Sequence, residues 1–187
     1  RLAKFPVPDS VWDEYHIDQE INDRGVRLDM DLVQKAIEMD TRSRTELTAS
    51  MKKLTALDNP NSVQQMKQWL SENGLETDTL GKKAVAELLK TASPELQTVL
   101  TLRQQLAKSS VRKYQTMERA ACDDGRAHGC FAFYGANRTG RWAGRLIQLQ
   151  NLPQNHLEDL ADARALVKSG DFDAVKMLYE DVPDTLS

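Results

Sequence analysis

One short stretch of the chain, residues 135–153, concentrates side chains that could recognise a nucleic acid. It carries Arg138, Arg141 and Arg145, followed by a Gln-x-Gln-Asn cluster at 148–151, and glycines and a proline interrupt it. A guanidinium group offers paired donors to phosphates, and amide side chains both donate to and accept from base edges. The stretch therefore predicts contacts with phosphates or base edges, although a basic surface loop would have a similar composition.

The charge of the chain supports a polyanionic partner for this region. The net charge of the whole chain is only −3, but residues 1–100 carry −4, residues 101–150 carry +6 and residues 151–187 carry −5. A basic block between acidic flanks attracts polyanions such as nucleic acids. The alternative is a solvated helix face whose charges pair with the acidic flanks.

Other chemistries have little sequence support. Cys122, His128 and Cys130 could supply three zinc ligands, but a structural zinc site needs a fourth and none is nearby. No Ser-His-Asp arrangement has a recognisable spacing. We therefore expect neither catalytic residues nor a metal site in this chain. The two cysteines and the absence of a long apolar run or a signal sequence lead us to expect a cytoplasmic protein that does not bind membranes.

Apolar residues at helical spacing predict a series of helices before the basic stretch. The first ends at Gly25, the second is capped by Asp29 or Asp31, the third is capped by Ser62, and the fifth begins at Ser93-Pro94. The expected ranges are 11–24, 30–57, 62–73, 80–91 and 93–123.

Two of these helices are long, about 40 Å each at 1.5 Å per residue. Because two short helices join them, they predict an antiparallel helical hairpin with a helical tip. Asp40 and Arg44 interrupt the apolar stripe of the second helix, which indicates a helix that projects into solvent midway.

After Gly125 the pattern changes from helical to alternating. Residues 127–134 alternate as in a half-buried strand, residues 146–149 predict a second short strand, and residues 156–179 return to a helical pattern. The expected fold class is therefore mainly α with a small antiparallel β element (α+β).

The motif Thr139-Gly140-Arg141, followed by Gln150-Asn151-Leu152-Pro153, resembles the TGR…LQNIP signature at the front of the palm in family A DNA polymerases, the DNA polymerase I group. The sequence of the motif is similar to that of the phage and prophage branch. Weaker resemblances lie in residues 21–29, 59–62, 106–114 and 125–128.

The resemblance implies that the chain is a fragment of a longer nucleotidyltransferase involved in DNA replication. Residues 1–28 would lead into the thumb, 29–122 would form the thumb hairpin with its tip at 58–93, and 123–155 would form the leading palm strands. Residues 156–187 form an acidic helical segment that matches nothing in the group. The catalytic aspartates of the family lie outside this chain, so Mg²⁺ and dNTP are expected only for the full-length enzyme, and the fragment alone is expected to be inactive.

The same resemblance assigns primer–template duplex DNA as the partner. It implies that Arg141 reaches the minor groove at the primer end and that Gln148, Gln150 and Asn151 contact the two strands. The remaining implied DNA-binding residues are Lys108, Asn59, Asn61, Ser62, Thr139, Arg138 and Arg145. Two alternatives remain: a non-enzymatic helical protein-interaction module, and a single-strand binder. The second is disfavoured because the aromatic residues fall mostly on apolar stripes and leave few stacking platforms.

Overall fold

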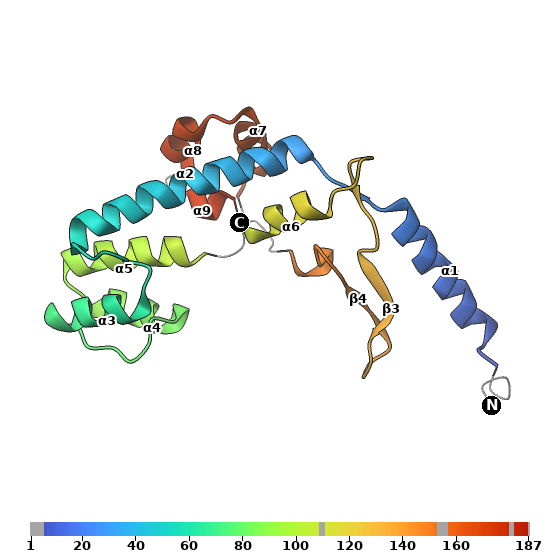
Figure 1. Ribbon diagram of the computed structural model, residues 1–187, viewed down its shortest axis with the longest axis horizontal. Helices are drawn as coiled ribbons and strands as arrows, with labels where there is room; N and C mark the ends of the chain where they lie inside the picture. The colour runs from blue at the N-terminus through green and yellow to red at the C-terminus, as the bar shows by residue number, and fades with distance from the viewer. Residues whose placement is uncertain (1–5, 109–110, 153–156, 180–181, 187) are drawn as a thin grey trace. The chain divides into compact units, whose positions relative to one another are not determined.

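The computed structural model describes residues 6–108, 111–152, 157–179 and 182–186. The chain divides into two compact units, which we call the first unit (Arg1–Lys35 and Arg112–Glu158) and the second unit (Ala36–Val111 and Asp159–Ser187). The described residues are mostly helical and include two small antiparallel sheets of two strands each (Figure 1). This confirms the fold class expected from the sequence. Each unit contains two separate stretches of chain, whereas the ranges expected from the sequence are consecutive.

The first unit begins with helix α1 (Asp9–Arg24), which ends where the sequence predicts. Gly25 follows at φ +65°, and its N–H donates to the carbonyl of Ile21. A Cβ at position 25 would lie 2.9 Å from the ring of His128, so both the backbone and the available space favour glycine there.

Two short sheets follow α1 in the first unit. Strand β1 (Val26–Arg27) pairs with β2 (Arg126–Ala127), and β3 (Phe131–Ala136) pairs with β4 (Arg141–Gly144). The side chain of Asn22 on α1 joins the edge of β3: its Oδ1 accepts from the N–H of Phe131 at 3.0 Å, and its Nδ2 donates to the Phe131 carbonyl at 3.1 Å. The amide of Asn22 thus acts as a strand neighbour and fixes α1 against the hairpin.

The prediction of a second short strand at 146–149 is wrong. Leu146 and Gln148 adopt φ values of +54° and +51°, which lie outside the β region, and Leu149–Asn151 form a 3₁₀ turn. Ile147, between the two unusual residues, is buried with Ala127 and Cys130 in the small core of the first unit. The apolar residues at 146–149 therefore belong to a loop that the buried side chain of Ile147 holds in place. The strand that pairs with β3 comes earlier, at β4.

The second unit is built on helix α2 (Met30–Thr55), of which residues from Ala36 onward belong to this unit. Helices α3 (Val63–Glu72), α4 (Lys82–Thr91) and α5 (Pro94–Ala107) follow. The predicted caps are confirmed: Asp29 accepts from the N–H of Leu32, Ser62 from that of Gln65, and Ser93 from that of Leu96.

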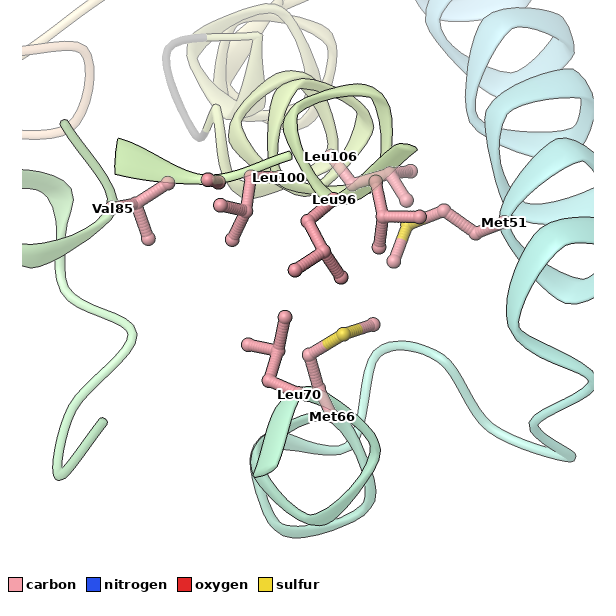
Figure 2. Packing of buried hydrophobic residues seen from close by; sticks show 9 residues of the cluster. Met51, Met66, Leu70, Val85, Leu96, Leu100 and Leu106 are labelled. Atoms are coloured by element: carbon pink, nitrogen blue, oxygen red, sulfur yellow. The ribbon is translucent and has the colours of Figure 1, made fainter. Parts of the chain in front are cut away.

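The core of the second unit lies where α2, α3, α4 and α5 meet (Figure 2). Met66 and Leu70 on α3 and Leu100 on α5 are fully buried, and Met51 reaches them from α2. Arg44 contacts the end of α5 at Leu106, and Figure 1 shows α5 running back along the second half of α2. The two helices form an antiparallel pair with α3 and α4 at its far end (Figure 1).

The structure contradicts two expectations about the long helices. The helix expected over 93–123 is two helices, α5 and α6 (Arg112–Ala120), and residues 109–110 between them lie outside the described residues. The second wrong expectation is that Asp40 and Arg44 lie on a part of α2 that projects into solvent. Asp40 is buried and accepts from Nε of Arg44 at 2.8 Å, while Arg44 donates to the carbonyls of Leu106 and Lys108. The charged pair caps the C-terminal end of α5, where the last carbonyls need donors.

Where the structure describes it, the acidic segment forms the short helices α7 (Leu160–Ser169), α8 (Phe172–Tyr179) and α9 (Val182–Thr185). Its expected start at His156 lies outside the described residues. Phe172 is buried with Arg42 of α2 over its ring at 4.1 Å, and Arg42 also bonds Asp173 at 2.7 Å. Lys176 reaches Glu46 at 2.7 Å and helps to lower the pKa of that carboxyl. Charge pairs and a buried aromatic ring therefore hold this segment on α2.

Candidate nucleic-acid interface

The candidate interface is the hairpin formed by β3 and β4, together with the loop that follows it. At the hairpin turn the N–H groups of Thr139 and Gly140 both donate to the carbonyl of Ala136, at 3.0 and 2.9 Å. Gly140 lies at φ +66°, and a Cβ there would meet the ring of Tyr134 at 3.0 Å. The Thr-Gly pair thus closes a tight turn that presents Arg138 and begins β4 at Arg141.

The three predicted arginines of this region, Arg138, Arg141 and Arg145, are exposed. Within residues 6–108, 111–152, 157–179 and 182–186, none of them forms an ion pair with a carboxylate. The sequence from 125 to 157 contains no Asp or Glu, so the hairpin is also positive as a whole. Exposed guanidinium groups without nearby carboxylates are suited to binding phosphates.

The predicted amide residues gather directly after β4. Asn151 donates from Nδ2 to Oε1 of Gln148 at 3.0 Å, and its backbone N–H donates to the Gln148 carbonyl at 2.8 Å. The side chain of Gln150 lies over Gly144, where a Cβ would be only 2.7 Å from its Cδ. All three amides are exposed. The left-handed conformation of Gln148 and the glycine at 144 bring them together, while Pro153, the last residue of the motif, lies outside the described residues.

One structural role for Arg141, pairing with Asp123 or Asp124, is not what the structure shows. Asp124 instead accepts from the N–H of Arg126 at 3.0 Å and contacts Nε2 of His128 at 3.1 Å. The hydrogen bond to Asp124 raises the pKa of His128, and the contact of its Nδ1 with the Asp23 carbonyl acts in the same direction. His128 therefore ties the end of α1 to β2 and leaves Arg141 exposed.

The other predicted residues belong to the second unit. Asn59, Asn61 and Ser62 form the turn between α2 and α3, where Oδ1 of Asn59 accepts from the N–H of Asn61 at 3.1 Å. The Asn59 N–H donates to Oε1 of Gln65 at 3.0 Å, so the side chain of Gln65 links α3 to the turn, while Ser62 accepts from the backbone N–H of Gln65. These side chains thus have a clear role in shaping the turn.

Lys108 directly follows α5, and its Nζ forms an ion pair with Asp184 of α9. Its side chain is 24% exposed. The residue expected to lie along a duplex is therefore engaged by the acidic segment in this structure. A polyanion that binds Lys108 has to displace or share the Asp184 carboxylate.

The sequence interpretation missed an aromatic surface in the first unit. Trp12, Tyr15, Tyr134 and Trp142 are each between 36% and 48% exposed, and Phe133 lies among them. The sequence places most aromatic residues on apolar stripes, which predicts few free stacking platforms. Spacing alone does not show whether a stripe is covered.

The structure adds two observations on ligands and membranes. In the described part of the chain, no three His, Cys, Asp or Glu side chains gather into a group that could hold a metal ion. None of the helices that the structure describes is long and apolar enough to cross a membrane.

Comparison with known proteins points in the same direction as the motif. The chain is 52% identical over 188 residues to a DNA polymerase of Bacillus phage SP02. The alignment includes all of this chain and 29% of that polymerase, so the chain spans less than a third of the length of its relative. No family model matches the chain. No solved structure matches it either. The chain is therefore similar, over its whole length, to part of a phage DNA polymerase.

Proposed function

We propose that this chain is a segment of a family A DNA polymerase of phage type, comprising the thumb and the front of the palm. The observation that carries the proposal is the 52% identity to a phage DNA polymerase over the entire chain. The geometry of the motif supports it, because the tight turn at 139–140 leads into the exposed Arg141 and the loop after β4 gathers three amides.

The proposed task of the segment is to hold primer–template duplex DNA without reading its sequence. The acceptors of the minor groove occupy similar places in every base pair, so an arginine and amide side chains can contact any correctly paired step there. Arg138 and Arg145 supply charge for the phosphates on either side of Arg141. In the second unit, the turn at Asn59–Ser62 and Lys108 are proposed to contact the DNA backbone.

The chemistry of nucleotide addition is proposed to lie outside this segment. Two-metal phosphoryl transfer needs carboxylates that hold both Mg²⁺ ions. The residues described here do not fit that requirement, because they contain no cluster of three potential ligands and the hairpin region 125–157 has no carboxylate. No catalytic step is therefore assigned to this chain. Highly purified chain with Mg²⁺ or Mn²⁺ should not extend a primer, and extension would overturn this part of the proposal.

The grip itself is tested by titrating the chain with a blunt 20-base-pair duplex at two salt concentrations. We expect a Kd of about 10⁻⁴ to 10⁻⁶ M near physiological salt, with no sequence preference. Arg141→Ala should weaken binding and reduce the slope of log K against log [salt] by about 0.9. Arg164→Ala is the matched control, because Arg164 is an exposed arginine in the acidic segment. Binding that is absent at low salt, or equally affected by both variants, would contradict the proposal.

A second candidate, a helical protein-interaction module, has one observation in its favour. Met177 and Leu178 on α8 are adjacent and exposed, at 77% and 63%. Exposed apolar neighbours of this kind occur at protein contacts. The duplex titration separates the two functions, since a module that binds only protein shows no salt-dependent affinity for DNA.

A further inference from the structure

The aromatic surface of the first unit has no role in holding a duplex. We define it as the aromatic face: Trp12 and Tyr15 on α1, Phe133 and Tyr134 on β3, and Trp142 on β4. The ring centroids lie 5.8 Å apart for Trp12 and Tyr15, 5.6 Å for Tyr15 and Phe133, 4.6 Å for Phe133 and Tyr134, and 6.2 Å for Phe133 and Trp142. Single exposed aromatic residues need no explanation, but a continuous group of them indicates a binding surface.

The strand register places part of this face beside the predicted amide cluster. Phe131 is opposite Gly144 in the β3–β4 pair, so Trp142, two residues before Gly144, points to the same side as Gly144. The side chain of Gln150 lies on Gly144. The aromatic face and the amides after β4 therefore share one surface of the hairpin.

Tyr134 is held on this face in a conformation that tyrosine rarely adopts. Its φ is +50°, within a β-bulge between Ala132 and Ala136, and its ring packs against Gly140 while remaining 46% exposed. Bulges redirect side chains, and unusual backbone conformations of this kind cluster at functional sites. The fold thus keeps a large, half-exposed ring at the surface next to the arginine-bearing turn.

The positive charge near the aromatic face indicates which class of partner binds there. Arg138, Arg141 and Arg145 lie on the same hairpin, and no Asp or Glu occurs from 125 to 157. Proteins that bind single strands combine aromatic rings, on which bases stack, with positive charge for the backbone. Asp13 and Glu14 on α1 would repel phosphates, so the backbone of a bound strand should follow the β3–β4 side.

We propose that the aromatic face binds single-stranded nucleic acid by stacking unpaired bases on Trp142 and Tyr134, while the hairpin arginines bind its phosphates. This goes beyond the proposed duplex grip, because the faces of bases inside a duplex are covered by their neighbours and are unavailable for stacking. It also reverses the expectation that the chain offers few stacking platforms.

The first experiment uses Trp142 as its own reporter. A Trp12→Phe, Trp69→Phe variant of the 187-residue chain retains Trp142 as its one tryptophan. Titration with a 12-nucleotide oligo(dT) should quench its fluorescence, whereas a blunt duplex at the same degree of saturation should leave it nearly unchanged. No quenching by the saturating single strand, or equal quenching by the duplex, would overturn the proposal.

The second experiment measures affinity for the same two probes by anisotropy. Trp142→Leu keeps an apolar side chain but removes the ring, and should weaken oligo(dT) binding by about 5- to 150-fold while duplex binding stays within twofold. Trp142→Phe should retain most of the single-strand affinity. Met177→Ala, which removes an exposed apolar side chain from α8, is the control and should change neither affinity.

The outcomes distinguish this inference from the proposed function. A loss with Trp142→Leu that is equal for both probes, or no loss for oligo(dT), contradicts base stacking even if the duplex grip is real. Single-strand binding that depends on the ring, in a chain that does not bind duplex, supports stacking and contradicts the proposed function. Far-UV circular dichroism identifies a misfolded Trp142→Leu chain, and in that case the quenching of Trp142 in the reporter variant decides.

Discussion

Gly144 offers a way to test the amide cluster without mutating any amide. In a Gly144→Ala variant the new Cβ would lie 2.7 Å from Cδ of Gln150 and even closer to its amide atoms. Contacts this short are not tolerated, but the obstacle is the end of a flexible side chain. Gly144 is also not among the glycines with positive φ, so its backbone accepts alanine. The substitution should therefore displace Gln150 and leave the hairpin intact.

The expected magnitudes separate folding from binding. Replacing glycine by alanine stabilises a compatible site by about 0.4–1 kcal/mol, and moving Gln150 to a poorer rotamer costs about 0.5–1.5 kcal/mol. The free energy of unfolding should thus stay within about 1 kcal/mol of the wild-type value. If Gln150 donates one hydrogen bond to DNA, its loss removes about 0.5–1.5 kcal/mol of binding free energy, or roughly two- to tenfold in affinity.

The assay is fluorescence anisotropy with a labelled duplex, combined with thermal unfolding. Gly81→Ala is the control, because its Cβ would lie 3.6 Å from the hydroxyl of Thr79, an ordinary contact. In a Gln150→Ala background the Gly144→Ala change should have no further effect, since both act through the same side chain. The reasoning is refuted if the two losses add, or if Gln150→Ala weakens binding and Gly144→Ala does not.

Three further predictions concern charge. In the intact parent polymerase, Arg141→Ala should slow single-turnover nucleotide incorporation by an amount equivalent to about 1–3 kcal/mol without lowering the Tm; a lowered Tm with wild-type incorporation would refute its role at the primer end. Asp184→Asn should strengthen duplex binding by the 187-residue chain, because it removes the carboxylate charge that pairs with Lys108, and unchanged affinity at low salt would show that Lys108 does not contact DNA. The hydrogen bond to Asp124 raises the pKa of His128 above 6.5, so the stability gained from this contact is fully present below pH 6.5 and is lost as the pH rises through the raised pKa. The Tm difference between wild type and His128→Gln should therefore shrink from pH 5.5 to 8.5. A constant difference would contradict the assignment.

Features that depend on neighbours in the chain could be predicted from the sequence. The end of α1 at Gly25, the caps at Ser62 and Ser93, and the turn before Arg141 all follow from contacts within about four residues. The positive charge of the candidate interface could also be predicted, because a stretch with three arginines and no carboxylate stays positive whatever its fold.

The tertiary structure decided what depends on distant partners. Arg44 and Leu106 are 62 residues apart, so their contact, which turns an apparent interruption of α2 into the cap of α5, has no local signal. Asn22 and Phe131 are 109 residues apart, and their pairing brings α1 to the hairpin. Periodicity shows which side chains share a face but not whether another element covers that face. For this reason the tertiary structure was needed to show that aromatic rings on apolar stripes form an exposed surface.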